Sequence, residues 1–161
     1  MTITVRKIIK SAYNEYSYKM RVVPDTNIFV SALKSNIGAS YAIISQLPSE
    51  QFRIVLSIPL YVEYQDVLTR PEHKSGISTT EEILAFLRYI CSIAHRQRIF
   101  FLWRPWLSDP KDDMLLEVAV ASQSRYIVTH NLRDFKGVEK HFGVTPVTPG
   151  KFLNIIRSQQ S

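Results

Sequence analysis

The sequence has too few cysteines and histidines, placed too far apart, for the common disulfide and zinc frameworks. The single cysteine, Cys91, has no partner for an internal disulfide, so a reducing compartment is expected. The four histidines, at positions 73, 95, 130 and 141, form no cluster with zinc-ligand spacing. These absences exclude a disulfide-stapled scaffold and a structural zinc site.

Glycine and long apolar runs are also scarce. The five glycines form neither a phosphate-binding loop nor a dinucleotide fingerprint. No apolar run approaches the roughly 18 residues of a membrane span, and the basic start of the chain leads into a polar stretch rather than a signal-peptide core. We therefore expect a soluble cytoplasmic protein that does not associate with membranes.

The composition that remains is that of an ordinary globular domain. The chain has 161 residues, 45% of them hydrophobic and 21% charged, which is enough for one domain with a real core. The net charge of +6 favours attraction to polyanions, and half of this excess lies in residues 1–19. We divide the chain into an N-terminal extension, residues 1–19, and a single domain, residues 20–161.

Short apolar runs alternate with helical stretches from Met20 onward. Strands are predicted at residues 20–25, 52–57, 98–103, 125–131 and 143–146. Helices are predicted at residues 26–34, 39–47, 58–70, 78–95, 114–124 and 149–158. Thr79 and Glu82 have the spacing of a capping box, and Ser57 is placed to cap the helix that follows it. This alternation predicts an α/β fold, with a parallel sheet of about five strands flanked by helices.

Acidic residues recur at the ends of the predicted strands and before the helix at 114–124: Asp25, Asp109, Asp112, Asp113 and Asp134. In an open parallel sheet, the loops that follow the strands converge on one edge, so several of these acids are expected to face each other. Glu63, in the predicted helix 58–70, can join them.

Clustered carboxylates suggest a metal site. The acids repel one another, and a divalent cation relieves that repulsion. Oxygen ligands without histidine or cysteine suit hard ions such as Mg²⁺ or Mn²⁺. Such an ion can activate a water molecule and polarise a phosphoryl oxygen, so phosphodiester hydrolysis fits these residues.

Each acid also has a simpler interpretation. Asp25 and either Asp109 or Asp112 can cap the helices that follow them. Glu63 can be a solvated residue of an amphipathic helix, and Asp134 can be a turn residue.

Four sequence blocks, in order, resemble the PIN-domain nucleases, a family that includes the toxins of bacterial and archaeal toxin–antitoxin pairs. RVVPDTNIFVSAL resembles the family's opening strand with its Asp-x-Asn, and SIPLYVEYQDVL resembles its serine-led acidic helix. DPKDDMLLEVAVA resembles the third acidic block, and IVTHNLRDF resembles the closing strand with its threonine and final aspartate. TPGKFL is similar to the start of the terminal helix, and the resemblance extends from about Met20 to Arg157.

The resemblance implies a metal-dependent endoribonuclease. Its catalytic and metal-binding acids would be Asp25, Glu63, Asp112 and Asp134. Four neighbouring side chains would support these carboxylates: Asn27, Thr129, Asp113 and Asn131. The implied cofactor is Mg²⁺ or Mn²⁺, and the implied partners are RNA, with DNA left open, an antitoxin protein and a second copy of the chain.

Two other functions stay open at this stage. The first is an inert nucleic-acid-binding or assembly module that retains the fold without the activity. The second is a phosphotransfer protein in which Asp25 is the covalent nucleophile, although Asn27 stands where such proteins have a second acid.

Overall fold

The computed structural model describes residues 4–5, 19–74, 78–100 and 105–160. Its single sheet has the strand order β3-β2-β1-β4-β5, and the strands are β1 Met20–Pro24, β2 Phe52–Leu56, β3 His95–Arg96, β4 Tyr126–Val128 and β5 Thr145–Val147. Every pairing is parallel, and β1 lies at the centre between β2 and β4. The predicted α/β class and the five-stranded parallel sheet are confirmed.

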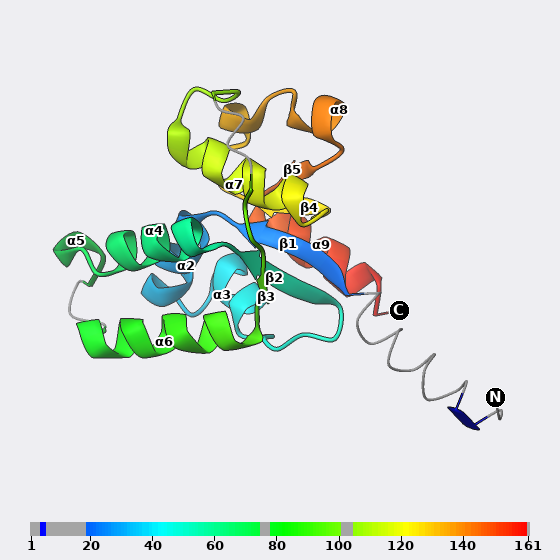
Figure 1. The fold of residues 1–161 in the computed structure, drawn as a ribbon. Helices are drawn as coiled ribbons and strands as arrows, with labels where there is room; N and C mark the ends of the chain where they lie inside the picture. Colours follow the sequence, from blue (N-terminus) through cyan, green and yellow to red (C-terminus); the bar gives the residue numbers. More distant parts are fainter. Residues whose placement is uncertain (1–3, 6–18, 75–77, 101–104, 161) are drawn as a thin grey trace.

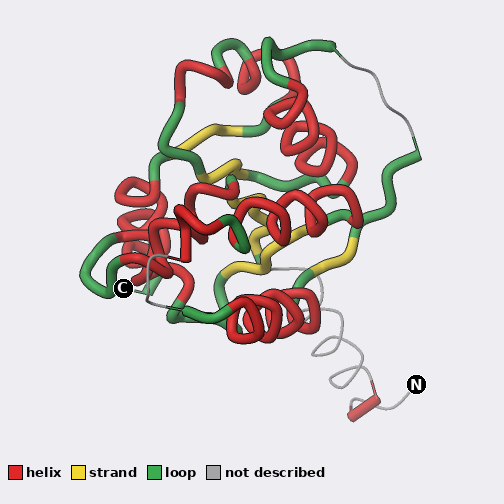
Figure 2. Tube along the Cα trace, turned by 90° about the vertical axis from the view of Figure 1, so that its left-hand side faces the viewer, coloured by secondary structure: helices red, strands yellow, loops and turns green. Residues whose placement is uncertain are grey.

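Helices cover both faces of this sheet. In chain order they are α2 Thr26–Lys34, α3 Ala39–Ile44, α4 Ile58–Leu68, α5 Pro71–Lys74, α6 Thr80–Ile93, α7 Pro110–Ala121, the 3₁₀ turn η1 Leu132–Phe135, α8 Val138–Phe142 and α9 Pro149–Ser158. Figure 1 shows α7 on one side of the sheet and α3 and α6 on the other, and Figure 2 shows the strands between these layers. α7 packs on β1, β2 and β4, and α6 packs on β2.

Side-chain caps fix where several helices begin. The Thr79 hydroxyl accepts a hydrogen bond from the Glu82 amide, and the Glu82 carboxylate accepts one from the Thr79 amide, so the predicted capping box is present. Ser57 caps α4 by accepting from the Leu60 amide at 3.2 Å. α4 therefore starts directly after β2, and this short connection brings the start of α4 to the carboxyl edge of the sheet.

An aromatic cluster packs α2 and α4 against each other beneath this edge. The rings of Phe29 and Tyr64 are both fully buried, with centroids 4.8 Å apart in an edge-to-face arrangement. The Tyr64 hydroxyl donates a hydrogen bond to the carbonyl of Pro24, the last residue of β1. This contact ties α4 to the end of the central strand.

The third strand differs from its prediction at residues 98–103. The strand in the structure is His95–Arg96, its residues pair with Val55 and Leu56 of β2, and residues 101–103 lie outside the described part of the chain. Pairing ends here because β2 stops at Leu56 and Ser57 begins the turn into α4. The strand predicted at residues 98–103 therefore begins after the last residue of β2 that could pair with it. One further hydrogen bond follows the paired residues, from the Gln97 amide to the Leu56 carbonyl.

Three short helical segments were not predicted: α5, η1 and α8. Gly137 and Gly143 flank α8 with positive φ angles of 86° and 69°, so two left-handed residues confine this helix to one turn. Segments this short lack the repeated apolar spacing from which helices are predicted.

Two further expectations concern the ends of the chain and the membrane. Residues 1–3 and 6–18 of the N-terminal extension lie outside the described residues, so the division at residue 20 stays a prediction. Among the helices that the structure describes, none combines the length and the apolar character needed to cross a membrane.

The capping box gives a stability prediction. Thr79→Ala removes the acceptor for the Glu82 amide, and we expect it to lower the free energy of unfolding by about 1 kcal/mol, measured by urea denaturation. Thr79→Ser keeps the hydroxyl and is the matched control, with a loss of less than about 0.5 kcal/mol. Equal losses in the two variants would contradict the role assigned to the hydroxyl.

Candidate active site

Asp25 lies at the carboxyl end of the central strand and is held there by its neighbour across the sheet. The pairing of Pro24 with Val128 aligns β1 and β4, so that Asp25 and the buried Thr129 leave the sheet side by side. The Thr129 hydroxyl donates to the Asp25 carboxylate at 2.8 Å, and the Asp25 amide donates to the Val128 carbonyl at 2.8 Å. Thr129 therefore orients the Asp25 carboxylate, as expected for a supporting residue.

The electrostatics of Asp25 argue against a simple capping role. Its carboxylate makes no capping hydrogen bond to α2, although it occupies the cap position. Burial raises the pKa of Asp25, and the hydrogen bond from Thr129, the nearby amides of Thr26 and Asn27, and the charge of His130 only partly offset this. A partly buried carboxylate with a raised pKa, held at the edge of a sheet by Thr129, is suited to binding a ligand.

Asp112 faces the same edge from the first turn of α7. Its pKa is raised to about 6, first by burial and then by the negative charges of Asp109, Asp25, Asp134 and Asp113. The pKa of Asp112 is therefore affected by the charges of Asp25, directly after β1, and of Asp134, in η1 after β4. These three predicted acids thus interact electrostatically in the folded chain.

Asp109 and Asp113, on either side of Asp112, have structural contacts instead. Asp109 caps α7 by accepting from the Lys111 amide at 2.9 Å. Asp113 is 1% exposed and accepts hydrogen bonds from the amides of Leu107 at 2.8 Å and Trp106 at 3.3 Å. The Asp113 carboxylate is thus used to fix the loop before α7, which leaves Asp112 as the acid of this block that is available to a ligand.

Glu63 reaches the site from α4 but already has a cationic partner. Its side chain is 16% exposed, and one of its carboxylate oxygens lies 3.0 Å from the Lys111 ammonium nitrogen, at the start of α7. The ion pair joins α4 to α7 beside Asp112. This ion pair was not predicted, because Lys111 and Glu63 are far apart along the chain.

The remaining predicted residues are more exposed. Asp134 lies on the exposed surface of η1, and Asn27 and Asn131 are also exposed. The Asn131 amide donates to the Thr129 hydroxyl at 3.1 Å, so its backbone supports the threonine that holds Asp25. Neither asparagine side chain is hydrogen-bonded to another described residue.

Tyr64 is a residue of the site that was not among the predicted ones. It lies below Asp25, and its pKa is raised well above the usual value, first by burial and then by the charge of Asp25. The tyrosine is therefore neutral, and its hydroxyl is committed to Pro24. In the sequence, the one sign that Tyr64 lies near the site is that it directly follows Glu63.

The chemistry of these donors fits a hard divalent cation. They are all carboxylates, which Mg²⁺ and Mn²⁺ prefer, and a cation would relieve the repulsion that raises the Asp112 pKa. Across the described ranges, no three acidic, histidine or cysteine side chains lie close enough together to ligate one ion. Binding would thus require the carboxylates of Asp25, Asp112 and Asp134 to move toward one another.

Comparison with solved structures supports the fold. A chain of the crystal structure of VapBC2 from Rickettsia felis, bound to a DNA fragment from their promoter, matches with a TM-score of 0.52. The match covers 80% of this chain and 98% of that chain, at 16% sequence identity. At this identity the similarity establishes a shared fold. No curated protein matches this sequence.

A family model gives the assignment. The model described as "PIN domain" matches residues 21–133, which is more than half of the chain and contains Asp25, Glu63 and Asp112. The order of strands and helices and the position of the acids at the carboxyl edge of the sheet agree with the sequence resemblance. On these grounds the chain belongs to the PIN-domain family of nucleases.

Proposed function

We propose that this chain is a metal-dependent endoribonuclease, which hydrolyses phosphodiester bonds with Mg²⁺ or Mn²⁺ and is the toxin of a toxin–antitoxin pair. The observation that carries this proposal is the PIN-domain match over residues 21–133, within which Thr129 holds the Asp25 carboxylate at the edge of the sheet by a hydrogen bond of 2.8 Å. The pKa of Asp112, raised to about 6 by burial and by the surrounding carboxylates, agrees with it. Negative charge held this way at the edge of a sheet favours a cation and, through it, a phosphate.

Each side chain of the site has a defined task in this proposal. When bound, Mg²⁺ or Mn²⁺ polarises a phosphoryl oxygen and lowers the pKa of a water molecule. Asp25, Asp112 and Asp134 would hold the ion, with Glu63 as the fourth acid. Thr129 keeps the Asp25 carboxylate in place by its hydrogen bond.

Lys111 supplies a positive charge beside the acids of the site. Its ammonium group is half exposed and now pairs with Glu63. If Glu63 served as a metal ligand, the Lys111 ammonium group would be available to a substrate phosphate.

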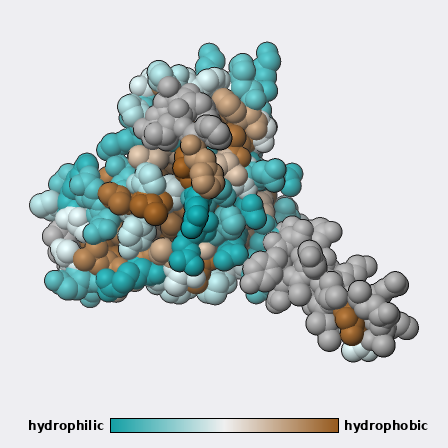
Figure 3. Space-filling model, viewed as in Figure 1, coloured by the Kyte–Doolittle hydropathy of each residue, from teal (hydrophilic) through white to brown (hydrophobic). Residues whose placement is uncertain are grey.

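A protein partner is supported by the surface beside the site. Ile58 and Val62 of α4 are 81% and 57% exposed, and Figure 3 shows hydrophobic side chains grouped over this helix. Exposed apolar side chains gathered next to a polar site are typical of protein interfaces. An antitoxin or a second copy of the chain would cover them, and the VapBC2 structure is a complex of this kind by its name.

A catalytically inert module is the second candidate, and the wide spacing of the acids favours it. In the described residues the carboxylates are not gathered around one point. Isothermal titration with Mn²⁺ separates the two functions, since an inert relative should bind no metal.

The first prediction of this proposal concerns Asp25. Asp25→Asn keeps the size of the side chain and removes its charge, so we expect metal-dependent cleavage of a labelled RNA to fall by more than the roughly 10–100-fold that is typical of losing a supporting residue. Asp66→Asn, at an exposed site on α4, is the matched control and should cleave like the wild type. Undiminished cleavage by a folded Asp25→Asn protein would defeat the proposal, and a DNA of the same sequence tests the choice of RNA.

The second prediction concerns the pH dependence of stability. The pKa of Asp112 is higher in the folded chain, about 6, than its ordinary value of 3.8, so the folded state binds more protons between these values and loses stability as the pH rises through them. Asp112→Asn removes this cost. We therefore expect the variant to have a higher urea midpoint than the wild type at pH 8 without divalent ions, and we expect no such gain near pH 4.

The control for this measurement is again Asp66→Asn, whose difference from the wild type should not follow the same pH course. Saturating Mn²⁺ should stabilise the wild type more than Asp112→Asn, because only the wild type has the full set of ligands. A gain for Asp112→Asn that is the same at pH 4 and pH 8 would contradict the role given to charge repulsion.

A further inference from the structure

A second charged site lies on the amino half of the sheet, away from the acids. It is a hollow of about 460 Å³ whose ionisable lining side chains are Lys19, Arg21, Arg53, His95 and Arg96. They come from the start of β1, from β2 and from β3, which are neighbours in the sheet. We call this group of five side chains the basic hollow.

The register of the sheet places three of these side chains, those of Arg21, Arg53 and His95, on one face. Arg96 directly follows His95 and therefore lines the hollow from the edge strand β3 rather than from this face. Arg21 and Arg53 are direct partners across β1 and β2, and His95 pairs with Val55, two residues beyond Arg53. Because side chains alternate between faces, residues at these positions point to the same side. Three adjacent strands thus present basic groups over a width of about 10 Å, two strand spacings.

α7 ends before it reaches this part of the sheet. Arg21 donates to the carbonyl of Ser122, the C-terminal cap of α7, at 2.7 Å. α7 therefore covers the carboxyl half of the face and stops where the basic hollow begins. Figure 3 shows hydrophilic surface over this region, beside the start of β1.

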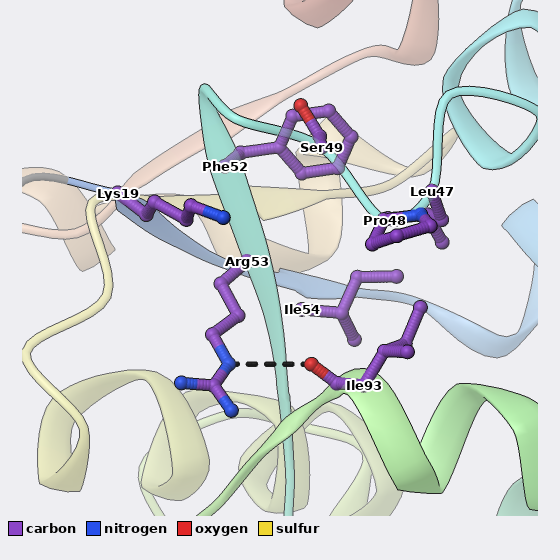
Figure 4. Close-up of a pocket in the computed structure, with 8 residues that line it drawn as sticks. All are labelled: Lys19, Leu47, Pro48, Ser49, Phe52, Arg53, Ile54 and Ile93. Carbon is purple, nitrogen blue, oxygen red and sulfur yellow. Dashed lines mark hydrogen bonds between the residues drawn. The ribbon is translucent and has the colours of Figure 1, made fainter. Parts of the chain in front are cut away.

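Neutral groups hold the guanidinium groups in place without balancing their charge. Arg53 donates to the carbonyls of Ile93 at 3.2 Å and Ala94 at 3.4 Å, at the end of α6, and Figure 4 shows the first of these bonds with Lys19 nearby. Within the described ranges, the one acid that pairs with the hollow is Glu50, 3.5 Å from Lys19 and 89% exposed. Such an exposed pair contributes little.

The lowered pKa of His95 agrees with an excess of positive charge in the hollow. Its pKa is lowered first by burial, then by the charge of Arg21 and, after the opposing hydrogen bond with Gln97, by that of Arg53. The positive charges of both arginines thus reach His95, and no carboxylate of a described residue contributes to its pKa shift.

We propose that the basic hollow binds backbone phosphates of a nucleic acid, at a site separate from the acidic edge. Arginine forks match phosphate oxygens in geometry and charge, and four of the seven residues that line the hollow are lysine or arginine. Arg21, on β1, and Asp25, directly after its last residue, are four residues apart, or roughly 13 Å along the strand. The proposal depends on the proposed function only in taking nucleic acid, rather than another polyanion, as the ligand.

The test measures binding without cleavage. A labelled single-stranded RNA and the DNA of the same sequence are titrated in EDTA by fluorescence anisotropy, over a series of salt concentrations. The test variant is Lys19→Gln with Arg96→Gln, which leaves the hydrogen-bonded Arg21 and Arg53 intact. The matched control is Lys140→Gln with Lys151→Gln, two exposed lysines of α8 and α9 that lie outside the hollow.

We expect the Lys19/Arg96 double variant to bind both nucleic acids about 10-fold more weakly, and the slope of log K against log salt to fall by about 2, one for each lost phosphate contact. The control pair should lose less than about 2-fold. Equal losses of affinity in the two pairs of substitutions, or no loss in the test pair, would overturn the proposal. Polyphosphate and polyglutamate are also added as competitors of the bound nucleic acid, and equally effective displacement by both would overturn it as well. Unchanged urea midpoints show that both variants are folded.

Failure of this proposal can be told apart from failure of the proposed function. Cleavage is assayed separately, in Mg²⁺, with the wild type and Asp25→Asn. Binding in EDTA that depends on Lys19 and Arg96, without any cleavage by the wild type, would support the basic hollow and reject the nuclease. Cleavage without such dependence would reject the hollow alone.

Discussion

The parallel pairing of β1 with β4 is the contact on which the candidate site depends. It places Asp25 beside Thr129 at the carboxyl edge of the sheet, where the threonine hydroxyl holds the carboxylate. α7 then brings Asp112 to the same edge, and its carboxyl is affected by Asp25 and Asp134. The folded chain accepts this repulsion at a cost in stability, which is expected where side chains are placed for binding rather than for folding.

The two ends of the central strand carry opposite charge. The carboxyl end of β1 leads into Asp25 and the acidic edge, while Lys19 and Arg21 stand at its amino end in the basic hollow. In the two proposals, one of these surfaces attracts a phosphate backbone and the other holds a divalent cation. The net charge of +6 alone does not reveal this division, because it depends on which residues the sheet brings together.

The sequence was sufficient for the fold but only for part of the site. Apolar runs and caps predicted β1, β2, α4 and α6, because these depend on neighbouring residues. The place of β3 depends on where β2 ends and α4 begins, so the apolar run after Arg96 was a poor guide. The different roles of Asp112 and Asp113 also depend on tertiary contacts. Both lie in the first turn of α7, but only the Asp113 carboxylate accepts hydrogen bonds from the amides of Trp106 and Leu107. The Lys111–Glu63 pair is of the same kind, since it joins two helices distant in sequence.

The most direct test of this account is the position of Mn²⁺ in crystals of the wild-type protein soaked at pH 8, located by its anomalous scattering. We expect a peak within about 2.5 Å of carboxylate oxygens of both Asp25 and Asp112, which would have moved toward each other around the ion. Crystals that take up Mn²⁺ elsewhere, or that leave the two carboxylates apart with no peak between them, would contradict the claim that mutual repulsion at this edge is there to be relieved by a cation.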